Sequence, residues 1–389
     1  MDTGEEGEEA GILIMLGVTV FGLLFANMPG FAHVWAAADL LPLQTATPGP
    51  LDSLAWWTGQ TFVAWVFNIL LIVLFGSALT LRQHSGAKSG LGWLSLLGLG
   101  LAYLVWYGEL LTVMAIAGMI ALPMRALRPV TRWASLVALV GGTFLIVLGG
   151  IGITALLPDT MGLPDLLGLD EARIAAIEAA HQSGFWARLP HNMATALQFH
   201  LVEFFFLGGG VLGLLLLGME LVERGFWGGR WPVMPLVISA AMALGIGLPL
   251  SGWSAVQALS VSFAPSQAWE GLVGRSFAAL LMAYGYAALV VLAVRFRIAE
   301  PVQLLFIRAG HLWLSVYVGQ IIVLTLIFSG LPGMGLFGRL GPAALFAFGF
   351  ALAGIQAAAV WLMDRYLRLG PLEWLLDGLE NRRFARLRR

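Results

Sequence analysis

PHNMATALQFHLVEFFFLGGGVLGLLLLGMELVE, residues Pro190–Glu223, contains an apolar run long enough to cross a bilayer. About 20 helical residues span ~30 Å of hydrocarbon, and counting this length back from Val222 puts Glu203 near one membrane boundary. His200 and Glu203 share one helix face at i, i+3 spacing. Ionisable groups at this depth usually face protein or water. The pair could therefore line a cavity open to one side, or be an interfacial carboxylate beside a histidine that reaches the headgroups.

The composition predicts a polytopic membrane protein. Of 389 residues, 59% are hydrophobic and 11% charged, whereas a soluble domain carries about 25% charged residues. The net charge of −1 provides no field for nucleic acid, so no nucleic-acid partner is expected. The absence of cysteine excludes disulfides and a cysteine nucleophile, and without HExxH or other ligand spacing no metal site is expected. The acidic start, MDTGEEGEEAG, differs from a secretory signal, so the first apolar run is expected to remain as a span.

Continuous apolar runs without period-two alternation predict an all-α bundle of about ten spans. The expected spans are residues 10–28, 59–81, 90–107, 109–124, 134–157, 192–222, 231–250, 271–294, 302–330 and 341–363. The third and fourth meet at Tyr107-Gly108-Glu109, which predicts a tight helical hairpin. No linker divides the chain, so we expect one transmembrane domain, 1–389, ending in a basic tail, 364–389.

Basic residues are distributed unequally between alternate loops, which predicts that both termini are cytoplasmic. One side carries Arg82, Lys88, Arg125, Arg128, Arg132, Arg224, Arg230, Arg295, Arg297, Arg365, Arg368, Arg382, Arg383, Arg386, Arg388 and Arg389. The other side carries only Arg173, Arg188, Arg275 and Arg339.

Three long segments are expected on the outer side. Residues 29–58 contain several prolines, residues 158–190 include a short helix in LDEARIAAIEAAH (169–181), and residues 251–270 are expected to be irregular. Acidic residues near the start of the short helix suit the helix dipole. These segments could cover an outward-facing cavity or simply connect spans.

Two groups of polar residues are candidate sites. Toward the outer ends of their spans lie Asn27, Glu109, His200, Glu203 and Arg275. These residues could bind a polar substrate, and a His–Glu pair could move a proton; alternatively they are separate interfacial residues. The ninth span carries Arg308, His311, Tyr317 and Gln320. Its arginine and histidine could meet a phosphate-bearing cytosolic donor, or serve as an anchor and a hydrogen-bonded histidine. Asn68 and Gln356 are expected to form interhelical hydrogen bonds.

Several segments resemble the YeiB-like family of bacterial inner-membrane proteins, defined as a domain of unknown function. They are RLGPLEWLLDGL (368–379), GLFGRLGPA (335–343), AGHLWLSVYVGQIIV (309–323), WYGELLTVMAIAGMIALPMR (106–125), LFGSAL (74–79) and Asn27-Met28. The resemblance implies an acyltransferase-like fold in the inner membrane, because the family is grouped with enzymes of the heparan-glucosaminide acetyltransferase type. It also implies acyl-CoA as a donor. Polar positions of the family are occupied here by Leu13, Leu16, Leu101 and Val316.

Three functions remain open. The first is an acyltransferase-like protein that acts on or carries a lipid or envelope precursor, with His200 as base and Glu203 orienting it. The second is a non-catalytic scaffold with a protein partner, which the aliphatic replacements favour. The third is a transporter of a lipid or small molecule. Membrane lipids are partners in all three.

Overall fold

The computed structural model describes residues 3–45, 47–81, 87–154, 169–263, 265–384 and 386–387. Nearly all of this described part is helical, and it contains no β-strand. Arg82, Arg388 and Arg389 of the expected basic side lie outside the described residues, as do residues 155–168 of the fifth expected span and second outer segment.

The longer helices are α1 (Thr3–Ala32), α2 (Pro50–Phe62), α3 (Val66–Leu81), α4 (Ala87–Leu104), α5 (Leu111–Met124), α6 (Pro129–Thr154), α8 (Glu171–Ser183), α9 (Phe185–Val202), α10 (Gly208–Glu223), α11 (Val233–Ser260), α12 (Pro265–Arg295), α13 (Glu300–His311), α14 (Trp313–Phe328), α15 (Pro342–Tyr366) and α16 (Pro371–Asn381). Short turns are the 3₁₀ elements η1 (Trp35–Ala38) and η2 (Leu41–Leu43) and the π-helical η3 (Glu203–Leu207).

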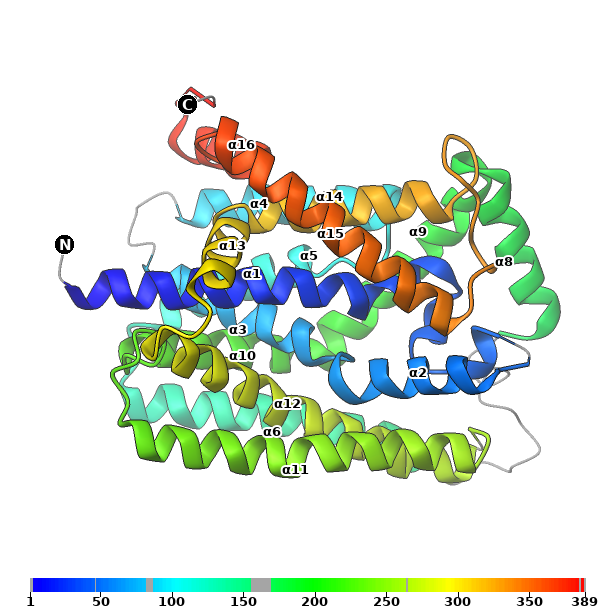
Figure 1. Ribbon diagram of the computed structural model, residues 1–389, viewed down its shortest axis with the longest axis horizontal. Helices are drawn as coiled ribbons and strands as arrows, with labels where there is room; N and C mark the ends of the chain where they lie inside the picture. Colours follow the sequence, from blue (N-terminus) through cyan, green and yellow to red (C-terminus); the bar gives the residue numbers. More distant parts are fainter. Residues whose placement is uncertain are drawn as a thin grey trace.

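The described chain is a helical membrane bundle. Seven helical stretches are long and apolar enough to cross: Gly7–Ala32, Pro50–Leu81, Pro129–Gly150, Phe185–Glu223, Val233–Ser260, Val273–Arg295 and Pro342–Tyr366. The bent pair α13–α14 makes up to eight, and α4 and α5 are shorter apolar helices. The ten expected spans thus correspond to these stretches, the bent pair and the α4–α5 pair. In Figure 1 the start of α1 and α16 lie toward one end of the bundle, while α8 and α2 lie toward the other.

The ninth expected span is not one continuous helix. α13 and α14 meet at Leu312 at an angle of 80°. Glu373 of α16 accepts hydrogen bonds from the backbone N–H groups of Leu314 and Ser315, at 2.8 and 3.1 Å, so the free N-terminus of α14 is capped. The carboxyl segment RLGPLEWLLDGL therefore has a structural role, because it supplies this cap.

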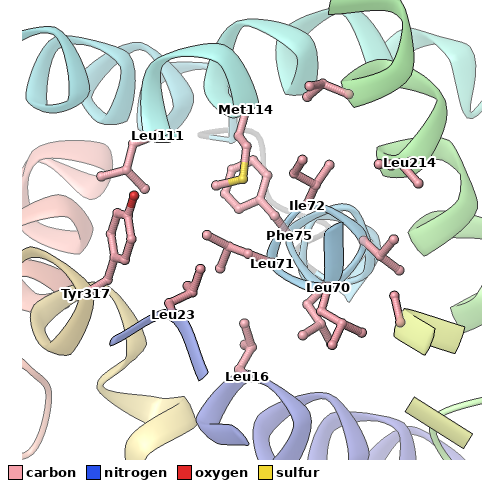
Figure 2. Packing of buried hydrophobic residues seen from close by; sticks show 14 of the residues in the cluster. Leu16, Leu23, Leu70, Leu71, Ile72, Phe75, Leu111, Met114, Leu214 and Tyr317 are labelled. Atoms are coloured by element: carbon pink, nitrogen blue, oxygen red, sulfur yellow. The ribbon is translucent and has the colours of Figure 1, made fainter. Parts of the chain in front are cut away.

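Packing on α1 and α3 forms the core. α1 contacts α3, α13, α14 and α15, and α3 contacts α10. Figure 2 shows Leu16 and Leu23 of α1 facing Leu70 and Leu71 of α3, with the Tyr317 hydroxyl pointing toward Leu111. Other positions where the resemblance expects polar groups, Leu101 and Val316, are likewise buried among apolar side chains. Leu13 is half-buried, and the backbone of α13 approaches its carbonyl at Gly310.

The outer segments are more helical than expected. The expectation of an irregular 251–270 is wrong, because α11 continues to Ser260 and α12 begins at Pro265. α2 begins at Pro50, inside the first segment, with a proline in its first turn where no N–H is needed. The short helix predicted in 169–181 is confirmed as α8, and Asp170 caps it by accepting from the Arg173 N–H.

A candidate binding cavity and the polar cluster beside it

A partly open cavity of about 670 Å³ lies between the helices of the bundle. Its walls come from the end of α1, from η1, α2 and α3, and from α5, α6, α9, η3, α10, α12 and α15. Most lining side chains are aliphatic or aromatic, including Phe25, Val113, Val147, Leu214 and Phe346. The volume falls within the range of roughly 300–1,000 Å³ that is usual for small-molecule sites.

Polar groups interrupt this apolar lining at a few places. They are Asn27, Asp39, Gln44, Gln60, Asn68, Tyr107, Thr143, Gln198, Glu203, Arg275 and Ser276. The structure therefore brings three of the residues predicted at the outer ends of their spans, Asn27, Glu203 and Arg275, to one cavity. Glu109 and His200 do not line it, although the neighbours of each do.

Arg275 of α12 is the cation of the lining. Its side chain is buried, and Nη1 donates a hydrogen bond to Gln60 Oε1 at 2.7 Å. Its guanidinium carbon lies 6.0 Å from the centre of the Trp56 ring, within the range of a cation–π contact. Asp39 is within electrostatic reach, but no carboxylate of the described residues forms an ion pair with Arg275.

Glu203 lies where α9 passes into the π-helical turn η3. A π turn inserts one extra residue per turn and so rotates the following side chains relative to an α-helix; such turns are frequent at functional sites. Beyond it, Gly209 and Gly210 pack against Thr143 of α6. The Glu203 carboxylate is buried, lines the cavity, and lies within electrostatic reach of Glu109.

Glu109 is held at the start of α5. Its Oε2 accepts from the Leu111 N–H at 2.5 Å and from the Thr112 N–H at 3.2 Å, while the Thr112 hydroxyl donates to Oε1. The carboxylate thus satisfies free N–H groups at a helix N-terminus, where the helix dipole favours negative charge. Beside it, the Leu110 N–H donates to the Tyr317 hydroxyl at 3.2 Å.

His200 turns away from the cavity toward α4 and α5. Its Nδ1 lies 3.4 Å from the Tyr103 hydroxyl, and its Nε2 lies 3.9 Å from Glu109 Oε1. This Nε2 atom is buried without a hydrogen-bond partner. The carboxylate next to the imidazole is therefore that of Glu109, whereas the sequence suggested Glu203. Glu109, His200, Tyr103 and Tyr317 form a buried polar cluster behind the cavity wall.

The other predicted residues lie elsewhere. Arg308 forms an ion pair with Asp364 of α15 at 3.2 Å, and His311 is exposed at the end of α13. Gln320 Nε2 donates to Val20 O at 2.7 Å and to Gln356 Oε1 at 2.6 Å. None of these residues lines the cavity.

The two expected interhelical hydrogen bonds have different outcomes. Gln356 bonds across helices to Gln320, as predicted. The Asn68 Oδ1 atom is buried without a partner, and Asn68 lines the cavity. Asn68 is thus a residue of the cavity, where its acceptor faces no described donor.

Some residues of the site had no distinct sequence signal. Asp39 lies in an expected outer segment, and Gln60 lies at the edge of an expected span. Tyr103 is one of many aromatic residues in the apolar spans. Gln60 could have been found, since it follows Trp56 at i, i+4 in the amphiphilic stretch LAWWTGQ. Among the described residues, no three His, Asp or Glu side chains gather as a metal site would require.

Fold and site define a polytopic helical membrane protein with a largely apolar internal cavity. Residues 222–380 match the family described as "Protein of unknown function (DUF418)". The chain is also 24% identical over 396 residues, covering 95% of this chain and 93% of the relative, to "Uncharacterized protein YxaH" of Bacillus subtilis (strain 168). No solved structure matches the chain. These matches support a relation to proteins of unknown function; the YeiB-like resemblance and the acyltransferase relation stay predictions.

Proposed function

We propose that this protein holds an amphiphilic membrane molecule, such as a lipid or lipid-linked envelope precursor, in the internal cavity. The observation that carries the proposal is the composition of the lining: a largely apolar chamber of about 670 Å³ that includes a few buried charged groups. Apolar chains gain by leaving water for such a lining, while polar groups at fixed positions orient a headgroup.

The proposal includes location. We propose the bacterial plasma membrane with both termini cytoplasmic, supported by the seven long apolar helices counted together with the bent pair α13–α14, by the basic loops and by the Bacillus subtilis relative. In that orientation the cavity lies nearer the outer surface, because α2 and the C-terminal end of α1, which line it, lie toward the end of the bundle away from α16 (Figure 1).

Photo-crosslinking tests the proposal. A diazirine-bearing phospholipid should label peptides around Val113 and Leu214, which are buried inside the bundle and line the cavity. Ala279→Phe adds a ring to the cavity wall and should abolish this labelling, whereas Ala241→Phe on the exposed side of α11 should not. Labelling confined to lipid-facing helices and unaffected by Ala279→Phe would exclude the proposal.

A second candidate is acyl transfer from a cytosolic thioester such as acyl-CoA to a hydroxyl of the bound molecule. It is favoured by the buried cluster of Glu109, His200 and Tyr103 behind Glu203, which could accept the hydroxyl proton. His200 itself is separated from the cavity, so Glu203 is the carboxylate that would touch the acceptor. An acylated lipid that disappears in Glu203→Gln would support this step. If lipid is bound but no acylated product forms, the result supports a lipid carrier. If a defined protein partner co-purifies without lipid, the result supports a scaffold.

A further inference from the structure

We propose that the amphiphile carries an anionic head, a carboxylate or a phosphate, and that Arg275 and Trp56 hold this head. This inference rests on the proposed function and adds the charge class of the ligand. It follows from two neighbouring groups: a buried guanidinium that forms no ion pair among the described residues, and a buried indole N–H without a hydrogen-bond partner.

Arg275 is a buried charge with incomplete compensation. Its described hydrogen bond is to a neutral amide oxygen, that of Gln60, and its guanidinium lies against the Trp56 ring. Burying a guanidinium carries a large desolvation cost unless an anion pairs with it. The buried arginine at the opposite end of the bundle has such partners, since Arg132 binds the carboxylates of Glu220 and Glu223.

Trp56 contributes a second donor, since its ring lies beside the Arg275 guanidinium. Its indole N–H is buried without a hydrogen-bond partner, and the residue lines the cavity. Buried indole N–H groups usually find an acceptor. An anionic oxygen between the indole and the guanidinium would satisfy both groups, and the guanidinium fork suits carboxylate and phosphate alike.

Asp39 is the alternative counterion for the buried Arg275 guanidinium. It lines the same cavity and lies within electrostatic reach of Arg275, but it forms no ion pair with that residue among the described contacts. Its Oδ1 accepts from the Trp65 indole N–H at 3.4 Å. If Asp39 were the sole counterion of Arg275, an added anion would gain little; if a ligand anion is the counterion, Asp39 opposes its binding.

The location of Arg275 supports a specific role. Basic residues concentrate on the opposite side of the chain, and Arg275 is one of the few on the expected outer side. Of the other three, Arg188 is also buried; its Nη1 donates to the Val105 carbonyl at 2.8 Å, its Nε has no hydrogen-bond partner, and its side chain does not line the cavity.

Native mass spectrometry of the full-length protein in detergent tests the inference with three probes of equal chain type. They are oleic acid (a carboxylate), dioleoylphosphatidylglycerol (a phosphate) and diolein (uncharged). At least one anionic probe should bind about tenfold or more tightly than diolein. Arg275→Gln and, to a smaller degree, Trp56→Phe should remove this preference and leave diolein binding unchanged. Asp39→Asn should strengthen anion binding.

Control variants separate the outcomes. Arg308→Gln removes a cation that is paired with Asp364 outside the cavity and should have no effect. Arg275→Lys retains the charge but not the fork, and should lie between wild type and Arg275→Gln. If Arg275→Gln fails to fold, the weaker anion preference of Arg275→Lys tests the same contact. Equal binding of all three probes, unaffected by these variants, would overturn the anionic head but leave the cavity proposal standing. Binding of no probe would overturn both.

Discussion

Glu373→Ala should weaken the bundle at the break between α13 and α14. The carboxylate accepts from two backbone N–H groups at the start of α14 and from the Ser315 hydroxyl. These N–H groups have no intrahelical partner, and α16 supplies the acceptor from a distant part of the chain. Loss of a helix cap usually costs about 1–2 kcal/mol, and donors left unsatisfied in a half-buried place add to this. We therefore expect Glu373→Ala to lower the free energy of unfolding by about 2–3 kcal/mol.

The assay is reversible unfolding in mixed micelles titrated with SDS, combined with hydrogen exchange of the Leu314 and Ser315 amides. Glu373→Gln should cost less than alanine, because its amide oxygen still accepts. Glu300→Ala is a matched control, since Glu300 is exposed and its contact with Arg297 is 3.8 Å long, so less than about 0.5 kcal/mol is expected. A Glu373→Ala variant with wild-type stability and unchanged exchange would refute the assigned role of the cap.

Three further outcomes follow from other contacts. Arg132→Ala should cost about 3–5 kcal/mol, because it leaves the buried Glu220 carboxylate without its main cation, and less in a Glu220→Gln background. Gly218→Ala should cost about 1–3 kcal/mol, since the added methyl meets the Val73 carbonyl of α3. Burial lowers the pKa of His181 to about 4 from 6.5, so the folded state binds fewer protons than the unfolded one. Stability should fall from pH 6.5 toward pH 4, by about 3 kcal/mol in total.

For each of these three predictions, a specific result would contradict the reasoning. Arg132→Ala and Glu220→Gln effects that simply add would show that the two groups are not coupled. A Gly218→Ala protein as stable as wild type would mean that α3 and α10 can separate at no cost. His181→Phe should flatten the acid limb of the stability profile, because it retains an aromatic ring beside Phe337 without a titrating group. An unchanged limb would assign the pH dependence to other residues.

Hydrophobic patterning was sufficient for the class of fold, because backbone in lipid must satisfy its own hydrogen bonds and long apolar runs can only be helices. It also located the α4–α5 pair and α8. The break at Leu312 was not predictable, since the nearby Gly310 is accounted for by its close approach to the Leu13 carbonyl and the cap comes from Glu373, about 60 residues away. Apolar content alone cannot reveal a bend that a remote side chain stabilises.

For the candidate site, the sequence predicted the membrane depth of the residues but not the direction of their side chains. Sequence placed Asn27, Glu203 and Arg275 at one membrane level, and the structure adds that all three line one cavity. Helical spacing also put His200 and Glu203 on one face, but α9 packs on α4 and the imidazole lies beside Glu109, whereas Glu203 lines the cavity. Side-chain direction depends on such local packing, which a single sequence does not contain.

Lipid mass spectrometry of the gently purified protein shows directly whether the cavity holds an amphiphile. We expect one amphiphile per chain, retained by Ala241→Phe and lost from Ala279→Phe, because only the second substitution fills the cavity wall. A protein that carries no amphiphile, or one whose bound lipid is unaffected by filling the cavity, would contradict this expectation.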